Sequence, residues 1–349
     1  LEFKKYNKIN MEITIARPFK LCKKLVVVDG LPGCGKTMLS AVISSLNRVE
    51  ILKYSYEIET LCLMNHLKKI DISTAKSMIQ FQLDLILYNQ TMGRELNFRF
   101  SDLSSVFKSI NKGTFFKRIF GPGDEEVPRM IQKNKPILHI VTHCLSSFSI
   151  PILEILEGDM LFINFHRDPL YMIKQNVWNM DNLNNTNRDF NLHYKYKSKK
   201  LPYFYFGQEK RMLKANAKEK AIFFLQWSRK NALKNTKLSS SKNVYELTFE
   251  SFVEEPFKHI LKVEKILNTK RTFKTKGVLK REKIPRKILS HGRDLSIYRR
   301  VNWEKSNSKN NIQERNELFK WTQSDISKEA KKSLEWLLED YSILVNKLS

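Results

Sequence analysis

The sequence predicts an α/β protein with three layers, αβα, in which a mainly parallel sheet lies between helices and carries helical insertions. Four short apolar runs rich in Val, Ile and Phe have the length of buried strands, at residues 25–28, 137–142, 160–165 and 244–248. Segments of helical periodicity separate them, the alternation that produces a parallel sheet covered on both faces. A glycine-rich turn follows the first run and precedes a helix-forming segment, as expected of a βα unit.

The predicted strands extend from the first turn to about residue 250, which favours a single domain over residues 21–349 behind a basic flank at residues 1–20. We expect a helical insertion at about 54–133 and a basic, aromatic one at about 180–220. Asp71 and Ser101 are the expected helix N-caps of the first insertion. Loops are expected at 121–125, 238–243 and 305–311, and a final amphipathic helix follows Ser324 with apolar residues at Leu334, Leu337, Leu338, Tyr341 and Leu344.

Composition limits the class of protein. The formal net charge of +26 fits an anionic partner, and it also fits a Lys-, Asn- and Ile-rich composition without functional meaning. No uninterrupted apolar run of about 18 residues is present, so we expect no membrane span. We also expect no signal peptide and a cytoplasmic location, since no apolar block follows the basic N-terminal residues. The widely spaced cysteines predict reduced thiols and no metal site: Cys22, Cys34, Cys62 and Cys144.

The segment GLPGCGKT has the pattern G-x-x-x-x-G-K-T, with Gly30, Gly35, Lys36 and Thr37 at the specified positions. In such a P-loop the glycines let backbone N–H groups converge on phosphate oxygens, and the following helix N-terminus and the lysine add positive charge. The threonine could hold Mg²⁺ if the ligand were a triphosphate. The later strands end in IVTH and FINFH, without the Asp that a P-loop NTPase places there, and this disfavours an ATPase or GTPase.

Four segments in order resemble the sulfotransferases that use 3′-phosphoadenosine 5′-phosphosulfate. GLPGCGKTML is similar to the family's phosphosulfate loop, PILHIVTHC to its strand ending in K-T-H, and LFINFHRDPLYMIKQNV to its R-[DN]-P-x-[DE] turn. AIFFLQWSRKNALK followed by VYELTFESFVEEPFKHI resembles the late helix, strand and Y-E-D-L-x-x-D-P turn. The sequence departs from these motifs at Gly33, where the family has a cation, at Val141, and at Gln175, where it has Ser.

The resemblance implies sulfuryl transfer from this donor to an acceptor hydroxyl without a required metal. It assigns the catalytic base to His143 and the grip on the 3′-phosphate to Arg167 with Gln175, while Arg299 and Arg300 are candidates for the family's C-terminal R-K-G loop. Lys36 is expected to neutralise the leaving phosphate. The loop residues expected to hold the donor are Gly30, Leu31, Pro32, Gly33, Cys34, Gly35, Lys36 and Thr37.

Alternative interpretations of the same residues are also consistent with the sequence. His143 could be a buried structural histidine, as we expect of His139, and Arg167 could instead form an ion pair with Asp168 or with another helix-capping acid. Residues 54–59 could line the acceptor pocket, although core packing of their aromatic rings is the safer prediction. The intact G-K-T favours a small-molecule kinase using ATP and Mg²⁺ as the alternative function, and a nucleotide-switched or nucleic-acid-binding module is a third.

The segment at 193–206 interleaves aromatic residues with lysines, and we expect an acceptor-facing or solvated loop in preference to a nucleic-acid site. The expected partners are the nucleotide donor and a hydroxyl-bearing acceptor such as a glycan or a small molecule. The sequence names neither this acceptor nor the oligomeric state.

Overall fold

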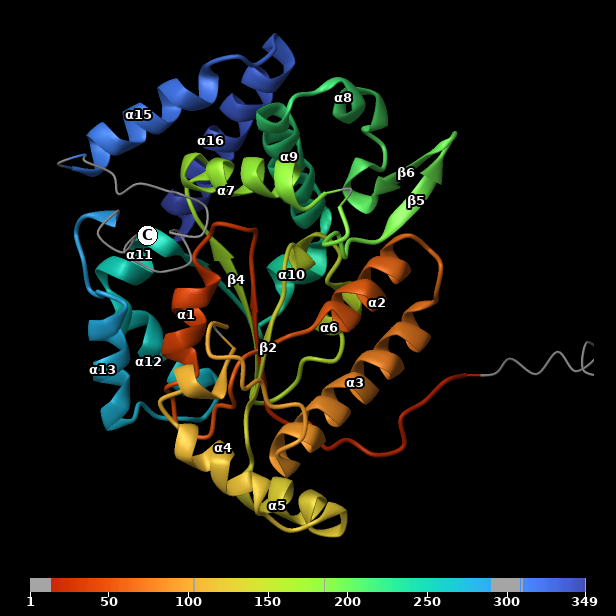
Figure 1. Ribbon diagram of the computed structural model, residues 1–349, viewed down its shortest axis with the longest axis vertical. Helices are drawn as coiled ribbons and strands as arrows, with labels where there is room; N and C mark the ends of the chain where they lie inside the picture. Colours follow the sequence, from red (N-terminus) through yellow and green to blue (C-terminus); the bar gives the residue numbers. More distant parts are fainter. Residues whose placement is uncertain (1–13, 103, 185, 290–307, 309, 349) are drawn as a thin grey trace, which may run out of the picture.

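A computed structural model describes residues 14–102, 104–184, 186–289, 308 and 310–348. Its centre is a five-stranded sheet in the order β2-β3-β1-β4-β7, and each neighbouring pair is parallel (Figure 1). The strands are β1 Leu25–Asp29, β2 Lys53–Tyr54, β3 Leu138–Val141, β4 Met160–His166 and β7 Val244–Thr248. The predicted parallel sheet is confirmed, and its four predicted strands are all present.

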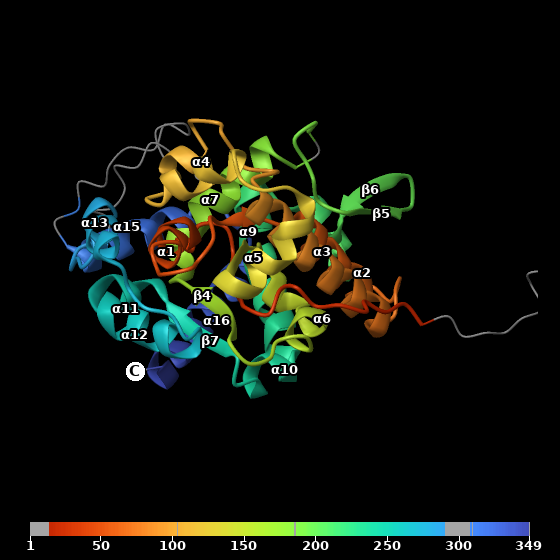
Figure 2. The same cartoon turned by 90° about the horizontal axis from the view of Figure 1, so that it is seen from below.

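The central strands are buried because apolar side chains on both of their faces are covered by helices. All five residues of β1 are buried, and Leu25 lies between Leu138 of β3 and Met160 of β4. Helices α1, α12 and α13 lie on one side of the sheet and α2, α3 and α6 on the other, in both views (Figures 1 and 2). This arrangement is the expected three-layer αβα fold.

The helices between β1 and β4 are α1 Lys36–Ile43, α2 Tyr56–His66, α3 Ile72–Met92, α4 Lys112–Ile119, α5 Val127–Asn134 and α6 Ile150–Leu153. Those between β4 and β7 are α7 Pro169–Asn182, α8 Glu209–Lys214, α9 Ala217–Lys234 and α10 Thr236–Ser240. The remaining ones are α11 Phe249–Glu254, α12 Pro256–Ile266, α13 Phe273–Arg281, α15 Asn311–Gln323 and α16 Lys328–Leu348. Short 3₁₀ helices occur at η2 Val106–Lys108, η3 Asp124–Glu126, η4 Leu145–Ser147 and η5 Tyr203–Tyr205.

The sequence analysis did not predict strand β2 or the β5–β6 hairpin, because neither contains a run of apolar residues. β2 has only two residues, and it joins the sheet where Lys53 pairs with Ile140. The expected loop at 193–206 contains an antiparallel hairpin of β5 His193–Tyr196 and β6 Lys199–Pro202. Lysines and tyrosines alternate in this hairpin, so it gives a weak strand pattern.

The expected helix ends are confirmed in one case and wrong in two. The Asp71 side chain accepts a hydrogen bond from the Thr74 backbone N–H at 2.9 Å and caps α3. Ser101 caps no helix; instead the Ser105 hydroxyl accepts from the Phe107 N–H at 3.3 Å and starts only η2, because serines in this segment bond the local backbone and compete with a longer helix. The loop expected from residue 238 begins inside α10.

The C-terminal amphipathic helix is present as α16, with Leu334, Leu337 and Leu344 buried. No helix in the described part of the chain is long and apolar enough to cross a membrane. All four cysteines are buried and unpaired by disulfides, and burial raises the pKa of the Cys144 thiol to about 12.

Candidate functional site

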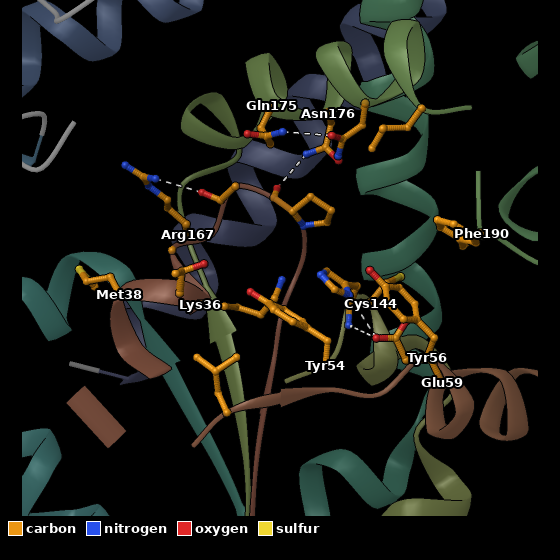
Figure 3. A pocket seen from close by; sticks show the side chains of 18 of the residues that line it. Lys36, Met38, Tyr54, Tyr56, Glu59, Cys144, Arg167, Gln175, Asn176 and Phe190 are labelled. Atoms are coloured by element: carbon orange, nitrogen blue, oxygen red, sulfur yellow. Dashed lines mark hydrogen bonds and ion pairs between the residues drawn. The ribbon is translucent and has the colours of Figure 1, made fainter. Parts of the chain in front are cut away.

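A cavity of about 640 Å³ opens at the carboxyl ends of the strands. Residues that end or follow all five strands line it: Pro32 after β1, Tyr54 in β2, His143 after β3, Arg167 after β4 and Phe249 after β7. In open parallel sheets this edge is where ligands bind, because strand ends and helix N-termini converge there. Figure 3 shows Arg167 toward one end of the cavity and Phe190 toward the other, with Lys36 and Cys144 between them.

The glycine-rich turn between β1 and α1 forms one end of this cavity. Gly33 and Gly35 have φ angles of +90° and +97°, which glycine adopts without strain, and Gly35 is the N-cap of α1. A Cβ at Gly33 would lie 3.1 Å from the Cα of Met172, so α7 packs directly on the turn. Lys36 is buried and its Nζ donates to the carbonyl oxygens of Gly30 and Leu31.

Most of the residues expected to hold the donor face the cavity. Those that line it are Pro32, Gly33, Gly35, Lys36, Thr37, Arg167 and Gln175. Gly30 and Leu31 instead line a smaller cavity of about 50 Å³ beside it, and Cys34 is buried. Arg299 and Arg300 lie outside the described residues.

A buried carboxylate at the end of β1 shapes the turn that carries His143. Asp29 accepts hydrogen bonds from the Thr142 hydroxyl at 2.9 Å and from the backbone N–H groups of Leu145 and Ser146 at 2.9 and 2.7 Å. Cys144 in this turn adopts φ +60°, which turns the chain sharply after His143. The His143 side chain therefore points into the cavity, and 32% of its surface is exposed.

Glu59 of α2 is the hydrogen-bond partner of His143. Its Oε1 accepts from the His143 backbone N–H at 2.8 Å and lies 3.1 Å from the imidazole Nδ1. A carboxylate at Nδ1 favours the tautomer with the proton on Nδ1, which leaves the lone pair on Nε2. Tyr54 and Tyr56 flank the imidazole, with ring centroids 5.6 and 5.9 Å away and ring planes tilted by 13°.

The preferred prediction of core packing for the aromatic rings of residues 54–59 is wrong for Tyr56, which is 53% exposed, whereas Tyr54 packs against the core. Both rings and Glu59 also line the cavity, as the alternative prediction had it. The Ser55 hydroxyl accepts from the Ile58 N–H at 3.4 Å and starts α2, and the first turn of that helix then carries Glu59 toward His143. Burial raises the pKa of the Tyr54 phenol, while a hydrogen bond with Thr37 lowers it. The sequence contains the Ser-x-x-x-Glu spacing, but it does not indicate that the Glu59 side chain contacts His143; only the tertiary structure shows this contact.

Arg167 is held by the glycine-rich turn. Its Nη1 donates to the Gly33 carbonyl at 3.0 Å, and its guanidinium lies 4.0 Å from the ring centroid of Phe249 and 5.0 Å from that of Tyr171. Its buried Nε has no hydrogen-bond partner in the described part of the chain. The alternative ion pair with Asp168 does not form, because Asp168 caps α7 at Leu170 and pairs with Arg315 at 2.7 Å.

Two polar residues of α7 complete this end of the cavity. The Gln175 side chain donates to Asn179 at 3.0 Å (Figure 3). Asn176, which the sequence analysis missed, donates to the Pro32 carbonyl at 2.9 Å and so ties the helix to the turn. Glu250 lies behind Arg167; burial raises the pKa of its carboxyl and the neighbouring Arg167 charge opposes this shift.

His139 occupies a different environment from His143 although only four residues separate them. It is fully buried in β3, and its Nδ1 lies 2.9 Å from the Ser44 hydroxyl. Burial lowers the pKa of His139 to about 3, so the imidazole is neutral. No cluster of His, Cys, Asp and Glu suited to a metal ion occurs among the residues that the structure describes.

The chain is similar in structure to two solved sulfotransferase domains. One comes from the Synechococcus PCC 7002 olefin synthase, with 12% identity, a TM-score of 0.44, and coverage of 93% of this chain and 97% of that one. The other comes from the curacin biosynthetic pathway, with 15% identity, a TM-score of 0.41, and coverage of 91% and 97%. No family model and no curated protein matches the sequence.

Proposed function

We propose that the protein is a sulfotransferase that moves a sulfuryl group from 3′-phosphoadenosine 5′-phosphosulfate to an acceptor hydroxyl. The supporting observation is the shared cavity of His143, Lys36 and Arg167, in which Glu59 orients the His143 imidazole. A base, a phosphate-binding turn and a second phosphate-binding cation are the groups that this transfer needs.

The residues present fit the donor. The turn at 33–37 and the N-terminus of α1 suit its 5′-phosphosulfate, since backbone N–H groups and the Lys36 charge converge there. Arg167 suits the 3′-phosphate, because its guanidinium is a planar donor and its buried Nε lacks a partner in the described residues. The donor would supply an activated sulfuryl group. The side chains would bind the donor, orient the acceptor and take up its proton.

His143 acts as the general base. Its Nε2 takes the proton of the acceptor hydroxyl while the acceptor oxygen bonds to sulfur and the bond from sulfur to the phosphate oxygen breaks. Glu59 stabilises the imidazolium that forms, and Lys36 neutralises the charge on the leaving phosphate. Lys36 bonds to the Gly30 and Leu31 carbonyls, and it exchanges these bonds for the phosphate oxygen.

A kinase is the second candidate, favoured by the position of Lys36 in the turn. Magnesium at Thr37 would call for a nearby carboxylate. Among the described residues that line the cavity, the carboxylates are Glu59, which bonds His143, and Glu282. Asp29 is the acidic residue nearest the turn in sequence, and backbone N–H groups and Thr142 occupy its oxygens. These contacts favour sulfuryl transfer over a magnesium-dependent kinase.

Thermal unfolding with nucleotides tests the proposal, because a ligand that binds only the folded state raises the melting temperature. We expect 3′-phosphoadenosine 5′-phosphate to raise it equally with Mg²⁺ and with EDTA, and ATP to have a smaller effect. Stabilisation by ATP only in the presence of Mg²⁺, with no effect of the 3′-phosphorylated nucleotide, would establish the kinase instead.

A further inference from the structure

A cluster of exposed phenylalanine rings lies on the surface formed by α4 and the segment between α3 and α4. Its members come from the loop after α3, from η2 and from α4: Phe98, Phe100, Phe107 and Phe116. The ring centroids of Phe100 and Phe107 are 4.6 Å apart, and those of Phe98 and Phe116 are 5.8 Å apart. Each of the four residues is at least 37% exposed. The rings therefore pack against one another while they keep much of their apolar area in water.

Helix α4 extends this cluster at the edge of the molecule (Figures 1 and 2). Phe120 follows Phe116 by four residues, so both lie on one side of the helix, and Phe120 is 88% exposed. Ile119 is three residues after Phe116 and is also exposed, whereas Phe115 is buried beneath the helix. We call the exposed set the aromatic patch: Phe98, Phe100, Phe107, Phe116, Ile119 and Phe120. Contiguous apolar side chains left in water in this way are typical of a binding surface.

Positive charge surrounds the aromatic patch. Residues 96–120 contain five Lys and Arg residues but a single acid, which pairs with Arg99 at 3.4 Å. Lys108 and Lys112 are exposed, and neither forms an ion pair within the described part of the chain. Lys112 precedes Phe116 by four residues and so lies on the same side of α4 as the exposed rings. Charge complementarity therefore calls for an anionic partner at this apolar surface.

Two contacts bring further cations from α13 beside the patch and connect the patch to the cavity. Lys274 Nζ donates to the Ile110 carbonyl at 3.0 Å, and Arg281 donates to the Lys108 carbonyl at 3.5 Å. Phe107 lies between residues of the same segment that line the cavity, among them Lys108 and Ile110. A partner bound at the patch therefore lies beside the cavity.

We infer that the aromatic patch is a membrane-binding surface that docks on the anionic headgroups of a lipid bilayer. Phe100 and Phe120, 69% and 88% exposed, project into solvent and enter the boundary between headgroups and acyl chains, where an apolar ring gains free energy. The ammonium groups of Lys108 and Lys112 bind the lipid phosphates. The inference is independent of the proposed sulfuryl transfer, because it concerns the outer surface of the protein and not the contents of the cavity.

The same observations favour a bilayer over two other partners. A protein partner must supply a complementary recess for each projecting ring, whereas a fluid bilayer accommodates rings of any arrangement. A second copy of this chain, placed symmetrically on the patch, would bring Lys112 and its neighbouring cations toward the same cations of its partner. An anionic lipid surface satisfies both the rings and the charges.

Co-sedimentation of the full chain with lipid vesicles tests the inference. The probes are vesicles of phosphatidylcholine alone and vesicles in which phosphatidylserine replaces part of it. We expect binding to the anionic vesicles to be at least about tenfold tighter, since each cation near such a surface adds attraction. No binding to the anionic vesicles, or equal binding to both kinds, would overturn the inference. The assay contains no nucleotide, so its failure is distinguishable from failure of the proposed function.

A matched pair of double variants separates the rings from the total charge of the protein. Phe100→Ser with Phe120→Ser removes the two most exposed rings of the patch and keeps every charge. Ile312→Ser with Ile343→Ser alters exposed side chains of α15 and α16, which lie apart from α4 (Figures 1 and 2). We expect the first variant to bind anionic vesicles at least about tenfold more weakly and the second to bind like wild type. Equal affinities of the two variants would contradict the inference.

A second pair tests the position of the charge. Lys112→Glu and Lys332→Glu change the net charge equally, but Lys332 is exposed on α16. We expect Lys112→Glu to weaken binding to anionic vesicles about tenfold and Lys332→Glu to have a much smaller effect, because the attraction falls off within a Debye length of the membrane. Similar losses would contradict the inference. A dimer in analytical ultracentrifugation that the phenylalanine variant dissociates, without vesicle binding by wild type, would assign the patch to a second copy instead.

Discussion

The two ends of the cavity are built in different ways. The end that we propose for the nucleotide comes mainly from one continuous stretch, β1, the turn at 30–35 and α1, to which Arg167 is added. The other end, which several aromatic rings line, comes from α2, α7, η5 and α9 and from Phe148 after η4, with no motif in any one of them. Backbone N–H groups can be arranged by local glycine spacing alone, whereas a pocket of side chains requires the whole fold. The contrast predicts that substitutions at the end with the glycine-rich turn weaken nucleotide binding, whereas those elsewhere in the cavity leave nucleotide binding unchanged.

His143→Ala should have the largest effect, because it removes the proposed base, which lies between the two ends. We expect kcat to fall about a thousandfold, in the range that general bases contribute, with unchanged affinity for 3′-phosphoadenosine 5′-phosphate. Initial rates of nucleotide release and calorimetry measure the two quantities. His66→Ala, outside the described lining of this cavity, is the control. A loss of nucleotide affinity equal to the loss of rate would erase the distinction between the ends.

Lys36→Met removes the positive charge from the nucleotide end. We expect kcat to fall about a hundredfold, as when one preorganised charge-stabilising group is lost, and nucleotide affinity to fall with it. Lys117→Met, on the exposed surface of α4, should leave both unchanged. Full activity of Lys36→Met would mean that the G-K-T pattern has no part in the reaction.

His139 provides a prediction for stability that is independent of function. Burial lowers the pKa of His139 to about 3, whereas a histidine in an unfolded chain takes up a proton near pH 6.5. The unfolded state therefore binds more protons between these values, and the free energy of unfolding falls as pH drops through this window. Between pH 6.5 and 5 the loss from His139 is about 2 kcal/mol. Urea unfolding of His139→Gln should show a flatter pH dependence than wild type; an identical slope would contradict the assigned burial.

Glu59→Gln should have the smallest effect of the four. The amide oxygen still accepts the Nδ1 proton, but it lacks the charge that stabilises the imidazolium, so we expect kcat to fall about tenfold with unchanged nucleotide affinity. Glu57→Gln is the matched control, since Glu57 is on the same helix and bonds Ser55 instead. A larger loss for Glu57→Gln would indicate that α2 itself, and not the Glu59 carboxylate, is responsible.

The elements that could be predicted from the sequence are those that neighbouring residues along the chain determine. Strands β1, β3, β4 and β7 are apolar runs, and the Asp71 cap depends on residues three apart, so both could be inferred without a structure. The positions of Lys36 and Thr37 followed from glycine spacing in the same way. The missed features depend on tertiary contact: Glu59 meets His143 across 84 residues, and Asn176 meets Pro32 across 144. Neither hydrophobic periodicity nor motif spacing indicates which residues so far apart in the sequence come into contact.

The central claim, that one end of the cavity holds a 3′-phosphorylated nucleotide without metal, is tested most directly by calorimetric titration in EDTA. Affinities of 3′-phosphoadenosine 5′-phosphate and of AMP would be measured for wild type and for Arg167→Ala. The account predicts that wild type binds the 3′-phosphorylated nucleotide at least about tenfold more tightly than AMP, and that Arg167→Ala abolishes this preference, because a charge-assisted contact to the 3′-phosphate is lost. Equal affinity of wild type for the two nucleotides, or a preference that survives in Arg167→Ala, would contradict it.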